Sequence, residues 1–374
     1  MRAASVALAV AALVAMALTY RSTPPVDLSE FGFADDMVKG EVVTVEEAGC
    51  GGVDDNVLRC WDVVFRVGEG PARGAFVYQT FPVDPLSPEF APGDRVRLSY
   101  AAGSPVEYAF AYADRERLGV LVGWGVLFGV AVVALGRWKG VAALIGIGSS
   151  IAVILGYILP SLLGGAPPVL VAVVGASVIA FVTIWLTHGV TAFSAVALFG
   201  TVGTLAVVAL LSDLAFGMAR ITGLSSEEAT YLTLIPGVDI AGLVLAGAVL
   251  GALGALDDVT VTQASAVWEV RSANPSMAPP DLMAAGLRVG RDHIASTVNT
   301  LVLAYAGASM PLLVLFVLSG LAAGDVVNSE VVAVELVRTV VGSLGLVAAV
   351  PLTTWLASRV AHGLPPRPGF GHSH

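Results

Sequence analysis

The stretch LGVLVGWGVLFGVAVVALG, residues 118–136, has no charged side chain and decides the class of this protein. About 20 consecutive apolar residues let a helix cross the hydrocarbon core of a bilayer. Similar runs follow it along the chain, separated by short loops. Only 13% of all residues are charged and mean hydropathy is +0.84, whereas about a quarter are charged in a typical soluble domain. The sequence therefore predicts an integral membrane protein.

The apolar segments predict an α-helical polytopic membrane protein with seven or eight transmembrane helices. Residues 1–20 form either an uncleaved signal anchor, which we favour, or a signal peptide that is cleaved near Ala15-Met16-Ala17. A transmembrane helical domain is expected over residues 117–358. Its seven spans are expected at 118–136, 140–162, 168–187, 190–212, 238–257, 294–319 and 332–357.

Residues 21–116 interrupt the membrane-type sequence and have the pattern of a small β domain. Apolar and polar residues alternate from Arg95 to Tyr100, which is typical of a half-buried strand. Further strands are expected over 40–45, 57–67 and 74–83. Four or five short strands predict a small β-barrel of the OB or SH3 kind, an architecture that by itself identifies no activity.

The distribution of Lys and Arg predicts how the chain is oriented. Basic residues gather in alternate loops, beginning with Arg137 and Lys139 and including the C-terminal region. By the positive-inside rule these loops are cytoplasmic, so the β domain is extracytoplasmic. Residues 359–374 are then a cytoplasmic disordered tail, and no metal site is expected from its histidines.

Net charge and cysteine content narrow the range of partners. The net charge of −10 and the absence of a basic patch exclude nucleic acid as an expected partner. The only two cysteines are Cys50 and Cys60, both in the β domain. If that domain is exported, a disulfide between them is expected; the alternative is two reduced thiols.

No nucleotide-binding, zinc-binding or hydrolase motif appears in the sequence, and no cofactor is predicted. The candidate residues are instead polar or small side chains in apolar segments. Gly247, Gly251 and Gly254 form a small-residue stripe against which another helix can pack.

Asp257 and Asp258 follow that stripe. Either the span ends at Leu256 and both carboxylates lie in water, or they lie in the membrane. A carboxylate at the bilayer centre costs about 2.5–3.5 kcal/mol and usually faces a cavity, a cation or a proton path.

Two further groups of polar residues follow along the chain. Arg291 and Asp292 lie where the sixth loop returns to the membrane, and Asn299 lies about 10 Å deeper at 1.5 Å per residue. Glu335 and Arg338 are three residues apart on the last span, so they share one helix face. Arg291 is equally explained as a positive-inside anchor, and the Glu335–Arg338 pair as a local ion pair near the outer surface.

These polar groups resemble the motifs of the YibE/F-like family of bacterial multi-pass membrane proteins over about residues 137–355. The family's patterns G-A-x-x-D-V, G-R-D, T-x-x-N-T-L-x-L-A-Y and E-x-x-R-T-x-x-G-S-x-G-L-x-x-A-x-P-L-T recur here in order. The matching residues include Gly254, Ala255, Asp258, Val259 and Ser265; Gly290, Arg291, Asp292, Thr297, Asn299 and Tyr305; and Glu335, Arg338, Thr339, Gly342, Ser343, Pro351 and Thr353.

The resemblance implies a bacterial cytoplasmic membrane protein with an exported β domain, and it implies no biochemical activity. The family usually has an apolar residue at the position of Asp257, which favours Asp258 as the functional carboxylate. We therefore predict one inward-facing polar cluster that contains an Asp–Arg pair, and a separate outer pair of Glu335 and Arg338. The predicted cluster consists of Asp258, Ser265, Arg291, Asp292 and Asn299.

Two classes of function remain open at this point. Buried ionisable residues and interrupted spans favour a transporter or permease of a small solute or ion. The alternative is a non-transporting envelope accessory or assembly protein that binds a partner through its β domain. An enzyme is the least supported reading, because no nucleophile and base stand together. Beyond the lipid bilayer, the expected partner is another membrane protein or a second copy of the chain.

Overall fold

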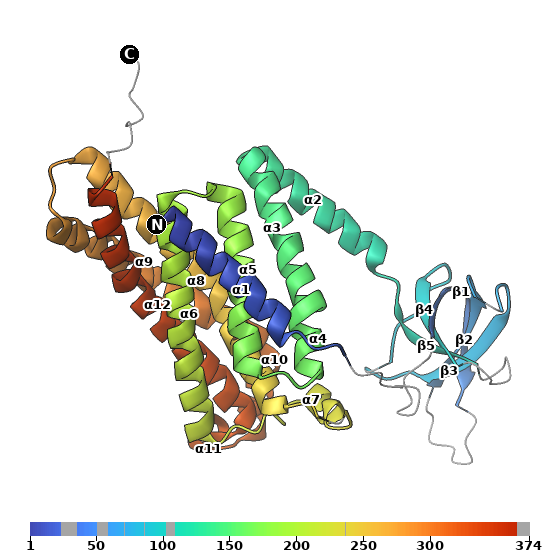
Figure 1. Cartoon of the computed structure of the whole chain (residues 1–374). Helices are drawn as coiled ribbons and strands as arrows, with labels where there is room; N and C mark the ends of the chain where they lie inside the picture. The colour runs from blue at the N-terminus through green and yellow to red at the C-terminus, as the bar shows by residue number, and fades with distance from the viewer. Residues whose placement is uncertain are drawn as a thin grey trace. The chain divides into compact units, whose positions relative to one another are not determined.

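The computed structural model describes residues 1–23, 36–50, 59–70, 72–85, 87–101, 109–235 and 237–364. The chain divides into two compact units (Figure 1). One unit joins the N-terminal helix, residues 1–24, to the helical region from residue 132 onward, and the other covers residues 25–131.

The smaller unit contains one antiparallel sheet with the strand order β3-β2-β1-β4-β5. Its strands are β1 (Asp36–Gly49), β2 (Arg59–Val67), β3 (Phe76–Pro82), β4 (Arg95–Tyr100) and β5 (Phe110–Arg115). The two edge strands approach each other, since the backbone N–H of Tyr112 in β5 donates to Oε1 of Gln79 in β3 at 2.8 Å. The sheet thus curls into a half-barrel, which confirms the expected β domain but with an incompletely closed wall.

The core of the half-barrel explains its sequence pattern. Val42, Phe65, Val96 and Leu98 are almost fully buried and alternate with exposed residues along their strands. Gly40 lies in the central strand β1, where a Cβ atom would be 2.8 Å from the side chain of Leu98. Glycine at this position therefore lets the apolar layer close over the sheet.

The larger unit is helical, and the helix that begins at Leu118 belongs mostly to the smaller unit. Across both units, most of the expected spans are confirmed as helices. Within the part of the chain that the structure describes, seven helices are long and apolar enough to cross a membrane. They are α1 (Arg2–Thr19), α2 (Leu118–Gly136), α3 (Trp138–Val153) continued by the π-helical turn η2 (Ile154–Ile158) and α4 (Leu159–Leu163), α5 (Pro168–His188), α6 (Ala192–Ala219), α8 (Ile240–Ala273) and α12 (Glu330–His362).

The span expected at 294–319 is instead a bent pair of helices. Helices α9 (Pro279–Ala308) and α10 (Met310–Ser319) meet at an angle of 66°. Pro311 explains the break, because it has no N–H to donate to the preceding turn and its ring clashes with that turn's carbonyl. Two short helices, α7 (Glu227–Leu232) and α11 (Ala323–Asn328), lie in the connecting segments.

Helix α8 is longer than the expected span, which was predicted to end at residue 257. It continues to Ala273 because its buried face repeats every three or four residues through Leu256, Thr260, Gln263 and Val267. The two aspartates therefore lie in the middle of a helix. Helix α12 likewise extends to His362, and the remainder of the expected tail, residues 365–374, lies outside the described residues.

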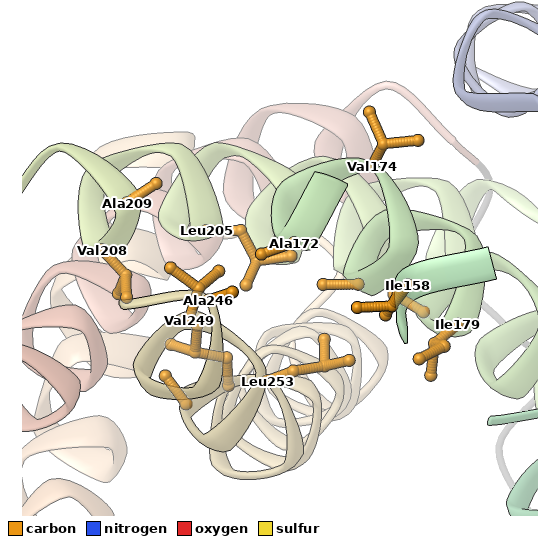
Figure 2. Close-up of a cluster of buried hydrophobic side chains, with 14 of the residues drawn as sticks. Ile158, Ala172, Val174, Ile179, Leu205, Val208, Ala209, Ala246, Val249 and Leu253 are labelled. Atoms are coloured by element: carbon orange, nitrogen blue, oxygen red, sulfur yellow. The ribbon is translucent and has the colours of Figure 1, made fainter. Parts of the chain in front are cut away.

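Helix α8 occupies the centre of the bundle and packs against α5, α6, α9 and α12. Figure 2 shows buried apolar side chains of α5, α6 and α8 that meet in this core, among them Ala172, Leu205 and Val249. Helix α1 packs against α5 and α6, and the hydroxyl of Thr19 at its end lies 2.6 Å from that of Tyr157 in η2.

In the β unit, the structure joins Cys50, directly after β1, to Cys60 in β2 by a disulfide, with their Cα atoms 5.3 Å apart. We expect this bond in protein purified from membranes without reductant. Non-reducing peptide mass spectrometry should recover one cross-linked peptide pair that contains both residues. Quantitative alkylation of both thiols before reduction would contradict the pairing.

Candidate functional site

The carboxylate of Asp257 lies inside the helical bundle and receives hydrogen bonds from two neighbouring helices. Its Oδ2 atom accepts from the hydroxyl of Thr183 in α5 at 3.0 Å, and Oδ1 accepts from the hydroxyl of Thr201 in α6 at 3.3 Å. Asp257 is 17 residues from the start of α8, or about 25 Å at 1.5 Å per residue. The carboxylate is thus far from the end of α8 at which the chain enters the span.

The hydrogen bonds continue from this carboxylate into the bundle. The hydroxyls of Thr201 and Thr260 lie 2.7 Å apart, and Thr260 also donates to the carbonyl oxygen of Asp257 at 3.2 Å. Both threonines are completely buried. Three helices, α5, α6 and α8, therefore contribute oxygen atoms to one polar layer in an otherwise apolar core.

A cavity of about 300 Å³ opens beside Asp257, between α3, α5 and α8. This volume has room for several water molecules. Its polar lining consists of Ser150, Thr183, Thr187, Asp257 and Asp258, and the rest is small or apolar. Small residues on α3, Gly146 among them, keep that wall open. The arrangement can hold a small hydrated or partly hydrated ligand against a carboxylate.

The neighbouring Asp258 points in a different direction, because successive residues of a helix are about 100° apart. Its side chain is 69% exposed, and its Oδ2 atom lies 3.8 Å from Nε2 of His293 in α9. The sequence favoured Asp258 over Asp257 as the functional carboxylate, whereas the geometry favours Asp257. The helical pattern carried a usable signal, since Asp257 is four residues after the buried Leu253 and three before the buried Thr260.

The structure does not join the other residues of the predicted cluster by direct contacts. Arg291, Asp292 and Asn299 are exposed on α9, and Ser265 is half-buried on α8. Among the described residues, no hydrogen bond or ion pair links these four to one another or to Asp258. The predicted pair between Asp258 and an arginine is therefore replaced by the contact with His293.

The packing of α8 against α9 and α12 explains why Arg291 is exposed and does not reach the predicted cluster. The amide Nε2 of Gln263 donates to the carbonyl of Gly286 in α9 and to the hydroxyl of Thr354 in α12, both at 2.7 Å. A Cβ atom on Gly290 would lie 2.5 Å from Val350 in α12. Gly290 thus faces the bundle, and Arg291, one residue further round the helix, points away from it.

Glu335 and Arg338, which were predicted to form an outer pair, form an ion pair in α12, with Nη1 of Arg338 2.8 Å from Oε1 of Glu335. Arg338 also donates from Nη2 to the carbonyl of Val244 in α8 at 3.4 Å. A Cβ atom on Gly247 would lie 3.5 Å from that guanidinium group, and one on Gly251 would lie 2.6 Å from the hydroxyl of Tyr305. These two glycines make room for long side chains, whereas no atom lies within 4 Å of the corresponding position at Gly254.

Replacing Gln263 with Leu should weaken the junction of α8, α9 and α12. The variant loses two buried hydrogen bonds, which together correspond to about 1–3 kcal/mol of unfolding free energy. We expect a lower melting temperature for purified Gln263→Leu protein in detergent. Thr262→Val is the matched control, because the Thr262 side chain forms no hydrogen bond within the described part of the chain. Equal melting temperatures for the two variants would contradict this role of Gln263.

Comparison with known families gives one match. The profile described as YibE/F-like protein matches residues 124–363, which is more than half of the chain and includes every helix from α3 to α12. Comparisons with curated proteins and with solved structures gave no match. The order of polar motifs, the helical bundle and the extent of the profile agree, and the chain belongs to the YibE/F-like family.

Proposed function

We propose that this protein transports a monovalent cation across the membrane and that Asp257 binds that cation during transport. The cation is a proton or an alkali metal ion, both of which a carboxylate can hold. The observation that carries the proposal is the position of Asp257, whose carboxylate lies within the bundle and lines a cavity.

The carboxylate has hydrogen-bond donors but no positively charged partner. Among the residues that the structure describes, no lysine, arginine or histidine forms an ion pair with Asp257. An ionised carboxylate away from bulk water costs several kcal/mol unless a charge of opposite sign compensates it. A bound proton or metal ion provides that compensation, and its release gives the site two states of different charge.

The surrounding oxygen atoms suit such an exchange. Thr183 and Thr201 donate to the carboxylate, and each hydroxyl also has lone pairs that a cation can use. Carboxylate and hydroxyl oxygens are hard ligands, the kind that hard cations prefer. When a cation binds, the hydroxyl of Thr183 or Thr201 can rotate and give up its hydrogen bond to the carboxylate. This change requires no movement of the backbone.

The bundle also contains elements that can change conformation during transport. Helix α3, which forms one wall of the cavity, passes into the π-helical turn η2, and the α9–α10 pair is broken at Pro311. Such irregular turns and discontinuous helices are frequent at functional sites of membrane proteins. In the orientation proposed from the basic loops, the β domain is extracytoplasmic and the C-terminus cytoplasmic. The cavity then lies in the cytoplasmic half of the bundle, with Asp257 and Thr183 at its deeper end.

Cation flux into proteoliposomes tests the proposal, with Asp258 as an internal control. Wild-type protein and the variants Asp257→Asn and Asp258→Asn are reconstituted, and a proton, Na⁺ or K⁺ gradient is imposed in separate arms. We expect wild-type protein to pass one of these cations and Asp257→Asn to show the flux of protein-free vesicles. Asp258 also lines the cavity, but its side chain is mostly exposed and receives no hydrogen bond from Thr183 or Thr201, so Asp258→Asn should retain more flux than Asp257→Asn.

Two results would contradict the proposed function. The first is wild-type flux no greater than that of protein-free vesicles for all three cations. The second is undiminished flux in Asp257→Asn, provided that the variant elutes and melts like the wild-type protein.

A further inference from the structure

The outward face of α9 is polar, although α9 together with α10 is apolar enough to cross a membrane. Its exposed residues include Asp292, Ala295 and Asn299, with Arg288 and Val302 continuing the same row. The steps along this row alternate between four and three residues, which is the spacing of a seam between two helices packed side by side. Arg291 and Ser296 flank the row.

This face lies at the depth of the bundle interior. Gly290 packs against Val350, and Thr353, three residues further along α12, packs against Gly200. Gly200 is eight residues from the start of α6, or about 12 Å at 1.5 Å per residue. Asp292 and Asn299 therefore lie within the layer that α6 spans, with Asn299 about 10 Å further along α9.

Exposure of these side chains to lipid is unfavourable. A charged residue at the centre of a membrane-spanning helix costs about 2.5–3.5 kcal/mol, and such residues almost always face protein or a water-filled cavity. In the described part of the chain, no hydrogen bond or ion pair satisfies the side chain of Arg291, Asp292 or Asn299. Another surface must cover this face.

We propose that a second copy of this chain covers it, with two α9 helices parallel across a two-fold axis. Arg291 and Asp292 are adjacent, opposite in charge and nearly equal in depth. In a parallel two-fold pair that meets along Ala295, the two Asp292 side chains come together at the seam, and Arg291 of each copy, which flanks the row, lies beside Asp292 of the other. Two Arg–Asp pairs form, so each charge has one partner of opposite sign. The face is self-complementary in charge.

The deeper part of the seam fits the same arrangement. Asn299 of one copy faces Asn299 of the other, and paired amides between membrane helices form hydrogen bonds that stabilise association. The small side chain of Ala295, between the charged pair and the amide pair, lets the two helices approach closely. The polar residues of α9 that the cation site does not use thus serve assembly.

Cysteine cross-linking in native membranes tests the pairing. Cys50 and Cys60 are bonded to each other, so a single introduced cysteine provides the thiol that can form a cross-link between two copies. Mild oxidation should convert Ala295→Cys into a disulfide-linked dimer of two copies. Leu210→Cys on α6 is the control, because its position is also exposed but lies outside the α9 face. Cross-linking of Ala295→Cys no greater than that of Leu210→Cys, or mainly to a different protein, would overturn the proposal.

Exchange of the two charges distinguishes a specific pair of α9 helices from random collision of two copies in the membrane. In the Ala295→Cys background, Arg291→Asp alone or Asp292→Arg alone places like charges opposite each other, so the cross-linked fraction should fall severalfold. The double variant, with both substitutions, restores opposite charges and should recover the cross-link. Loss in both single variants without recovery in the double variant would overturn the proposed Arg291–Asp292 pairing. Labelling of the thiol introduced at position 295 by a water-soluble reagent, without any dimer, would overturn it as well.

Discussion

Burial of an uncompensated carboxylate is the constraint on which the rest of this structure depends. Asp257 lies in the central helix α8, where the medium is too apolar to solvate a negative charge. Thr183 and Thr201 supply hydrogen bonds but no positive charge. A cavity lies on the other side of the carboxylate, and under the proposed function it gives water or a cation access to Asp257. Under the proposed function, a bound cation supplies the missing charge.

The packing of the bundle follows from the need to hold that polar layer in register. Thr260 contacts Thr201 in α6, and Gln263 ties α8 to α9 and α12 through two short hydrogen bonds. Glycines at positions 200, 286 and 290 bring neighbouring helices close enough for these contacts. Without such close approach, buried hydroxyl and amide groups would lack partners, which is costly in a membrane.

The sequence was sufficient to predict the architecture. Apolar run lengths located the spans, and alternation from Arg95 to Tyr100 indicated strand β4. The sequence was not sufficient to predict the length of α8, because two adjacent aspartates are typical of the point where a helix leaves the membrane. The buried face of α8 passes through these positions without interruption, since its contacts are made by residues three or four apart. Pro311 signalled a break, but the angle between α9 and α10 depends on tertiary packing.

The candidate site was predictable only in part. The resemblance to family motifs directed attention to Asp258, Arg291, Asp292 and Asn299, which the structure places on exposed surfaces of α8 and α9. The hydroxyl partners of Asp257 come from α5 and α6, which are distant in sequence, so no local pattern could assign them. The sequence could have indicated that the Asp257 side chain points into the bundle. Asp257 shares a helix face with Leu253 and Thr260, which are both buried.

Accessibility of position 257 to an aqueous reagent tests the central claim most directly. The variant Asp257→Cys can be treated in membranes with small water-soluble thiol reagents of positive or negative charge. A cavity that admits cations predicts that the cationic reagent labels the thiol introduced at position 257, with little labelling of Leu256→Cys, whose position is completely buried. Equal resistance of both positions to the reagent would show that no aqueous path reaches Asp257 and would contradict the account.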